Sequence, residues 1–246
     1  MRSWIVAGLM LLAGCAAQTG SSGSDQALRD RARIHTELGS GYFAQGQMAI
    51  ALQEFNDAVK ADPSYSLAYN GLGLVYSNLH EDNKAEASFK RSIELEPDNP
   101  ESHNNYGVFL CARDRIDESI TQFMEAVKNP LYVSAGAAYL NAGVCSLKKQ
   151  DAKNAELYFR SALQAQPNLH GAAYQLALIA FNREDYLLAR GYLLNVMADN
   201  PKPEMLWLGV RVERALGDKD AEASYALLLK NKYPDSEQTK ALLSGQ

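Results

Sequence analysis

SLAYNGLGLVYSNLHEDNKAEASFKRSIELEPDN, at residues 66–99, is the stretch from which the fold of this chain can be deduced. Its large and small packing residues recur at spacings of three, one and three positions and then of four and three, so each half places them on one face of a helix. They are Tyr69, Leu72, Gly73 and Tyr76 in the first half, and Ala85, Phe89 and Ser92 in the second. Pro97 ends the second helix, because proline lacks a backbone N–H and disfavours helical geometry at the residue before it. The stretch predicts a pair of amphipathic helices that is too small to bury its own apolar faces.

The same pattern of packing residues, followed by a proline, recurs upstream and downstream of this stretch. Six units can be aligned, with Ser134 and Ala135 as additional residues between the third and the fourth: 32–65, 66–99, 100–133, 136–169, 170–203 and 204–236. The sixth is the most divergent, with Arg211 where the pattern asks for a small residue and with the landmarks Trp207, Val210, Ala223 and Leu227. The length and pattern of these units resemble the tetratricopeptide repeat. The resemblance implies an all-α, right-handed superhelical solenoid of six helix pairs, each packed on the next.

The segment 1–27 precedes the predicted solenoid. Arg2 and the short apolar run at 4–12 are typical of a signal peptide, and the run is too short to span a bilayer. Leu12, Ala13, Gly14 and Cys15 resemble the lipobox of bacterial lipoproteins, in which the cysteine is acylated and becomes the mature N-terminus. The alternative is an ordinary signal peptide with a chance cysteine. We predict a signal peptide at 1–14, a lipidated flexible tether at 15–27 and a solenoid at 28–246. Twelve tether residues forming a coil would reach roughly 20 Å.

Composition and charge limit the classes of partner. With 47% hydrophobic and 22% charged residues, the chain has the profile of a folded protein. Its net charge of -5 leaves no basic stripe to neutralise phosphates, so nucleic acid is not an expected partner.

No catalytic, cofactor or metal motif stands out in the sequence. His35 and His103 occupy the fourth position of their units, where a large side chain packs between helices. There is no HxxxH, CxxC, P-loop, GxSxG or GxGxxG motif. We therefore expect a protein that is not an enzyme, with no cofactor, no metal and no small-molecule substrate.

Cys111 and Cys145 lie late in the first helices of consecutive units. A disulfide requires their Cα atoms to approach to about 4.4 to 6.8 Å. Equivalent positions on adjacent repeats are usually farther apart, but the two cysteines are offset by two places, which shortens the gap. A disulfide, which an oxidising periplasm would permit, and two buried free thiols both remain open at this point.

The tetratricopeptide resemblance implies that the first helix of each unit lines a concave groove. From the second unit to the fifth the ninth position is apolar, which predicts a row of apolar side chains: Leu74, Val108, Val144 and Leu178. The fifth and sixth positions supply a row of amides: Asn70, Asn104, Asn105 and Asn141. Amides donate and accept hydrogen bonds, so they can bind the backbone of a peptide. We predict a groove for a protein segment with apolar side chains. The alternative is that each asparagine is solvated or caps local structure.

Three stretches depart from the general repeat and are more specific. They are NNYGVFL at 104–110, NPLYVSAGAAYLNAGVCSLK at 129–148 and LWLGVRVERALGDKDAEASYALLLKNKYPDS at 206–236. They resemble the type IV pilus biogenesis lipoproteins of the PilF/PilW kind. The resemblance implies a pilotin, anchored through Cys15 at the periplasmic face of the outer membrane, that binds the pilus secretin and promotes its localisation and multimerisation. The alternative is a scaffold lipoprotein of another envelope assembly, such as an outer-membrane barrel assembly or a cell-wall synthesis complex.

Overall fold

The computed structural model describes residues 19–196 and 201–245, and within these ranges every regular element is a helix. The lipobox and Cys15 lie outside the described residues. The elements are α1 (Thr19–Ala44), α2 (Met48–Ala61), α3 (Ser66–Asn78), α4 (Asp82–Leu95), α5 (Pro100–Ala112), α6 (Ile116–Ala126), α7 (Ala135–Lys148), α8 (Ala152–Ala165), α9 (His170–Asn182), α10 (Tyr186–Val196), α11 (Pro203–Leu216), α12 (Lys219–Lys232) and α13 (Glu237–Leu243).

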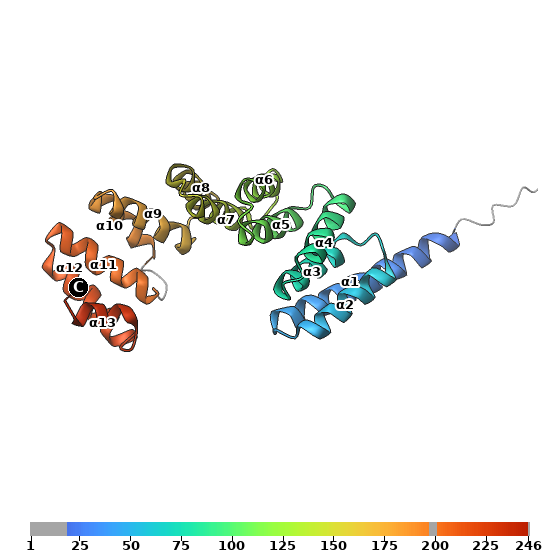
Figure 1. The fold of residues 1–246 in the computed structure, drawn as a ribbon, viewed down its shortest axis with the longest axis horizontal. Coiled ribbons are helices and arrows are strands. Elements are labelled where there is room, and N and C mark those ends of the chain that lie inside the picture. Colours follow the sequence, from blue (N-terminus) through green and yellow to red (C-terminus); the bar gives the residue numbers. More distant parts are fainter. Residues whose placement is uncertain (1–18, 197–200, 246) are drawn as a thin grey trace, which may run out of the picture.

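Consecutive helices pack as hairpins, and the hairpins stack side by side into a solenoid (Figure 1). The pairs are α1 with α2, α3 with α4, α5 with α6, α7 with α8, α9 with α10, and α11 with α12. The short α13 packs on α11 and α12 and closes the C-terminal end. The predicted all-α solenoid of six tetratricopeptide helix pairs is confirmed.

The turn inside each helix pair has a common backbone conformation. Its residue with positive φ recurs in every unit: Gly46, His80, Asp114, Gln150, Glu184 and Gly217. A left-handed residue at this place ends the first helix and reverses the chain. The turn between pairs is different, and in one case Asn99 caps the next helix, because its side chain accepts a hydrogen bond from the backbone N–H of Ser102 at 3.1 Å.

In every helix pair except α9–α10, where Leu193 takes the place of the ring, the core is built on a small residue that faces an aromatic ring. Phe55, Phe89, Phe123 and Phe159 have no more than 1% of their surface exposed. A Cβ atom added at Gly73 would lie 2.7 Å from the Phe89 ring, and one added at Gly107 would lie 2.7 Å from Phe123. The two helices can approach this closely only because the glycines have no side chain.

The phase predicted for the sixth repeat is wrong by two positions. The small residue that faces the aromatic ring is Gly209, whose added Cβ would lie 3.0 Å from Tyr225, and not the residue at the predicted position, Arg211. Leu227, predicted to be a packing residue, is 60% exposed. Arg211 points outward, and its guanidinium lies 4.4 Å from the Phe181 ring centroid. Gly209 follows Ala177, the small residue of the fifth unit, by 32 positions instead of 34, a difference that a fixed repeat period cannot detect.

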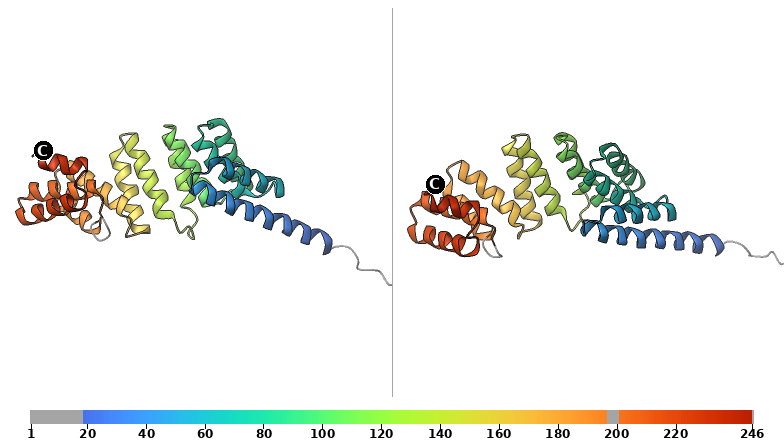
Figure 2. Two further views of the ribbon diagram at one scale, coloured as in Figure 1. Left: turned by 90° about the horizontal axis from the view of Figure 1, so that it is seen from below. Right: turned by 60° about the horizontal axis from the view of Figure 1, so that its bottom comes forward.

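The predicted flexible tether is wrong from Thr19 onward, because α1 begins there and runs for 26 residues. Figure 2 shows α1 extending well beyond the other helices at its N-terminal end. Arg29 ties this extension to the next repeats: its guanidinium lies 5.9 Å from the Tyr65 ring centroid and 4.0 Å from the Glu96 carboxylate. None of the helices in the described part of the chain has the length and apolarity needed to cross a bilayer.

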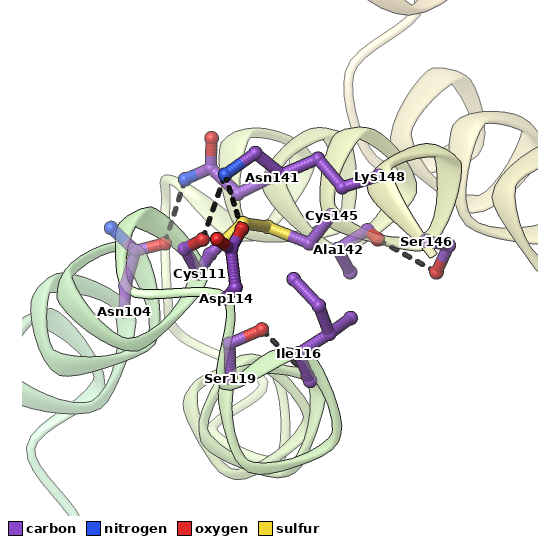
Figure 3. The surroundings of a disulfide bond; sticks show 10 residues. All are labelled: Asn104, Cys111, Asp114, Ile116, Ser119, Asn141, Ala142, Cys145, Ser146 and Lys148. Atoms are coloured by element: carbon purple, nitrogen blue, oxygen red, sulfur yellow. Dashed lines mark hydrogen bonds and ion pairs between the residues drawn. A yellow bond between two sulfur atoms is a disulfide. The ribbon is translucent and has the colours of Figure 1, made fainter. Parts of the chain in front are cut away.

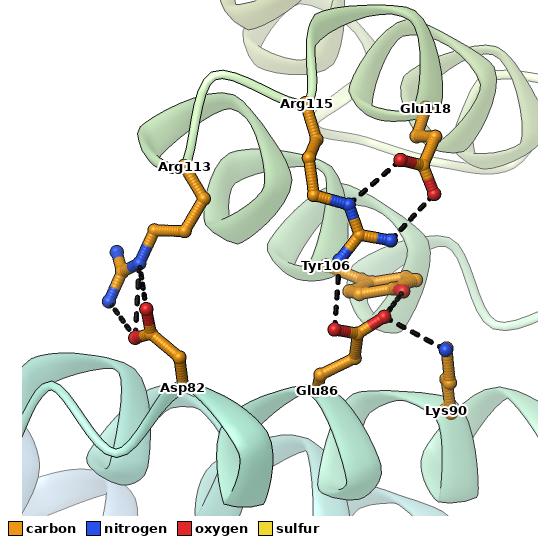
Figure 4. Close-up of polar contacts among 7 residues, drawn as sticks. All are labelled: Asp82, Glu86, Lys90, Tyr106, Arg113, Arg115 and Glu118. Atoms are coloured by element: carbon orange, nitrogen blue, oxygen red, sulfur yellow. Dashed lines mark hydrogen bonds and ion pairs between the residues drawn. The ribbon is translucent and has the colours of Figure 1, made fainter.

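Charged side chains join the second repeat to the third (Figure 4). Arg115 donates to Glu86 at 2.8 Å and also to Glu118, while the Tyr106 hydroxyl donates to Glu86 at 3.0 Å. Hydrogen bonds from Arg115 and then from Lys90 lower the pKa of Glu86 to about 2. Burial, and then the hydrogen bond to Glu86, raises the pKa of Tyr106 to about 12. The contacts favour the ionised carboxylate and fix the stacking of α4 against α5 and α6.

Candidate partner-binding groove

The predicted amide row forms a continuous chain of hydrogen bonds across three first helices. Asn105 on α5 donates to Asn70 on α3 at 3.3 Å, and Asn141 on α7 donates to Asn104 on α5 at 3.2 Å. Asn104 also approaches Asn105 at 3.5 Å, which completes the chain. The asparagines therefore bond to one another, an arrangement that differs from both predicted alternatives.

The four asparagines differ in their exposure and therefore in their ability to hydrogen-bond a binding partner. Asn70 is only 7% exposed, so its prediction as a groove contact is wrong. Asn104, Asn105 and Asn141 remain partly exposed. An amide has two N–H donors and an oxygen that accepts two bonds, so the bonds within the chain leave capacity for a peptide backbone. These bonds also hold the three amides in fixed orientations.

The predicted apolar row is interrupted. Val108 is 43% exposed and Val144 is 41% exposed, as expected for groove contacts. Leu74 packs against the core cluster around Phe89, and Leu178 packs against the cluster around Leu193. Both leucines are partly buried because they support the next repeat. The exposed apolar part of the row is therefore confined to α5 and α7.

Val108 and Val144 border a pocket of about 240 Å³ between α5 and α7. The other lining residues come from the same two helices and from α6: Cys111, Ala112, Phe123, Asn141, Cys145 and Lys148. The lining is mainly apolar, and Asn141, which donates to Asn104, and Lys148 are its polar members (Figure 3). Lys148 donates to the backbone oxygen of Cys111 at 2.9 Å and pairs with Asp114 at 3.3 Å. The pocket has the size and chemistry to accept one aliphatic side chain.

Cys111 and Cys145, which both line this pocket, form a disulfide (Figure 3). Their Cα atoms are 5.9 Å apart, inside the range that a disulfide requires. The offset of two places between the repeats provides this approach. The bond links α5 to α7 directly and fixes the distance between the two walls of the pocket.

The two histidines at the fourth repeat position have hydrogen-bonding partners on neighbouring helices and turns. His103 is 7% exposed, and its ring nitrogens contact Gln122 and the backbone oxygen of Pro97, each at 2.7 Å. His35 contacts Glu54 at 2.7 Å. Across residues 19–196 and 201–245, His, Cys, Asp and Glu side chains form no group of three or more suited to a metal ion.

A second exposed apolar surface, which the sequence reasoning missed, lies on α1. Ile34 is 50% exposed and Leu38 is 45% exposed. Their counterparts one repeat later, Ala68 and Leu72, are buried in clusters that include residues of α2. These α1 residues border a shallow pocket of about 390 Å³. The signal was available in the sequence, because a packing residue in the first unit has no preceding unit to cover it.

Comparison with known proteins extends these findings. Tetratricopeptide-repeat profiles match residues 36–79, 67–99, 88–127 and 112–170. The chain is 30% identical over 210 residues to the type IV pilus assembly protein PilF of Pseudomonas aeruginosa, covering 85% of this chain and 83% of that relative.

Two solved structures are similar along almost their whole length. One comes from the functional characterisation of Pseudomonas aeruginosa pilF; it has a TM-score of 0.78 and 27% identity, covering 90% of this chain and 99% of that one. The other is PilW, described as a widely conserved type IV pilus biogenesis factor; it has a TM-score of 0.73 and 32% identity, covering 86% of this chain and 98% of that one.

Proposed function

Because the chain belongs to the PilF/PilW family of tetratricopeptide-repeat type IV pilus biogenesis factors, we propose that it is an outer-membrane lipoprotein pilotin. In this proposal it binds the pilus secretin and promotes the localisation and multimerisation of the secretin in the outer membrane. The observation that carries the binding role is the Val108–Val144 pocket beside the asparagine chain.

The lipid anchor is proposed at Cys15. The cysteine ends a lipobox-like sequence and stands four residues before the start of α1. Multiple acyl chains on one cysteine would give stable attachment without a transmembrane helix. The helical α1 makes the connection between lipid and solenoid shorter and stiffer than the coil predicted from composition.

The groove is proposed to bind an extended segment of the secretin. One aliphatic side chain of that segment would enter the Val108–Val144 pocket, and Asn104 and Asn141 would bond its backbone on either side. Binding of this kind needs no catalytic group, which agrees with a protein-interaction role for the family fold.

The test replaces the pocket residues that are exposed and leaves the buried ones untouched. Val108→Asp and Val144→Asp should each weaken secretin binding by roughly tenfold or more, because each removes apolar contact and places a carboxylate in an apolar pocket. Leu157→Asp is the matched control, since Leu157 is 55% exposed on α8 and lies outside the pocket. Binding is measured with purified secretin periplasmic domains, and circular dichroism checks that each variant is folded. Equal affinity of all three variants and the wild type would exclude the groove.

The competing proposal, a scaffold for another envelope assembly, makes a different prediction for the anchor. Cys15→Ser should remove the protein from the membrane fraction and deplete secretin multimers there. Normal outer-membrane multimers in this variant would favour the scaffold.

A further inference from the structure

The connection between α6 and α7 displays two aliphatic side chains to solvent. Leu131 is 84% exposed and Val133 is 92% exposed, whereas Tyr132 between them is only 7% exposed. Tyr132 packs with Ala126 and Ala138 at the ends of the two helices. The buried tyrosine therefore acts as an anchor that turns its two neighbours outward.

This connection has a defined backbone. Leu131 N–H donates to the Asn129 side chain at 2.9 Å, and Tyr132 N–H donates to the Asn129 backbone oxygen at 3.1 Å. Ala135 N–H, at the start of α7, donates to the Tyr132 backbone oxygen at 3.2 Å. The exposed pair is thus presented by a hydrogen-bonded turn.

The chemistry of this turn differs from that of the equivalent turns. The others carry polar residues around their proline, as in Asp62–Ser64 and Glu96–Asn99, whereas this one reads NPLYVSA and has no charged residue from 129 to 147. Two fully exposed aliphatic side chains gain nothing from water, so an apolar environment outside the protein is the physical reason to display them.

The position of the turn indicates what that environment is. Helices alternate in direction along the solenoid, so every connection from a second helix to the next first helix lies at one edge. The N-terminal half of α1 lies at the same edge, where Arg29 contacts Tyr65 of the α2–α3 connection and Glu96 at the end of α4. Cys15 precedes α1 by four residues, which can span at most about 14 Å. A lipid on Cys15 would hold this edge toward the bilayer.

We propose that Leu131 and Val133 insert into the headgroup–acyl boundary of the membrane that holds the lipid anchor. The inference rests on the acylation of Cys15 proposed above. Acidic and basic side chains both occur at this edge, as in the pair of Glu96 with Arg29, so the contact is driven by apolar burial and suits a mainly zwitterionic, phosphatidylethanolamine-rich surface. Two contacts, the lipid and the turn, fix the orientation of the solenoid, whereas one alone would let it swivel.

The test places a fluorescent probe at the turn of the full-length lipidated protein in phosphatidylethanolamine/phosphatidylglycerol vesicles. Val133→Trp should show a blue-shifted emission that acyl-chain bromination quenches. Leu187→Trp is the control, because Leu187 is 69% exposed at the start of α10, at the opposite edge. The wild-type protein gives the background fluorescence of Trp207, which is subtracted from the emission of each variant.

The outcomes separate this inference from the proposed anchor. Flotation with the vesicles together with quenching of V133W but not of L187W supports the inference. Flotation without quenching of V133W overturns the inference and leaves the anchor intact, whereas failure to float overturns both. If L131S/V133S weakens secretin binding in detergent, where no bilayer is present, the turn is a protein contact and the inference is also overturned.

Discussion

Reduction of the Cys111–Cys145 disulfide should destabilise the middle of the solenoid. The two cysteines are 34 residues apart, so the bond closes a loop that contains α6 and most of α7. In the chain-entropy description, closing a loop of about 34 residues lowers the conformational entropy of the unfolded chain by roughly 12–13 cal/mol/K. At about 25 °C this entropy loss stabilises the folded state by roughly 4 kcal/mol. With an m value of about 2–3 kcal/mol/M, reduction should lower the urea midpoint of this region by roughly 1–2 M.

The assay compares urea unfolding of the oxidised and reduced protein by far-UV circular dichroism. Repeats in a solenoid contact only their neighbours, so the loss of stability on reduction should be largest in α5–α8. Amide hydrogen exchange should accelerate most in these helices. The Cys111→Ala/Cys145→Ala double variant is the control: both cysteines are buried, so it loses some packing, but its midpoint should not respond to reductant. Mass spectrometry without reductant should show a mass lower by two hydrogen atoms. Two alkylatable thiols in the folded protein, or identical midpoints with and without reductant, would refute the reasoning.

Two further predictions concern packing and pH. Gly107→Ala should destabilise the protein by about 1–3 kcal/mol, because the new Cβ would lie 2.7 Å from Phe123, whereas Gly191→Ala should stabilise it by about 0.5–1 kcal/mol, because nothing lies within 4 Å of that position. Urea unfolding measures both, and effects of the same sign would contradict the packing argument. The lowered pKa of Glu86 means that its ionised form contributes stability that is complete above its ordinary pKa of 4.5 and is lost as the pH falls toward about 2. The stability difference between the wild type and Glu86→Gln should therefore shrink over this interval, and a difference that stays constant from pH 5 to pH 2 would show that the contacts do not favour the carboxylate.

Periodic packing marks could be predicted from the sequence because each depends on a contact inside one helix pair. The spacing from Gly73 to Phe89 is the same as the spacing from Gly107 to Phe123, and a spacing repeated in phase specifies the same hairpin each time. The sixth repeat shows the limit of this reasoning. Its Gly209–Tyr225 pair keeps that spacing, but Gly209 follows Ala177 of the fifth unit by 32 positions, two fewer than the 34 of the repeat.

The residues predicted for the groove differ in exposure. Position in the repeat predicted that Val108 and Val144 are exposed in the groove. It made the same prediction for Asn70 and Leu74, which the neighbouring repeat largely covers. Burial at these positions depends on contacts between repeats, and the pattern of one unit contains no information about them.

The sequence by itself determined the helix pairs, their number and their stacking, since these follow from local spacing and from the need of each pair to bury its apolar face. Only the tertiary structure decided that the asparagines bond to one another across α3, α5 and α7, and that Cys111 and Cys145 approach closely enough to bond. It also showed that Tyr132 is buried while Leu131 and Val133 are exposed. The physical reason is the same in each case: these contacts depend on the offset and angle between successive repeats, which the packing of several helices sets together.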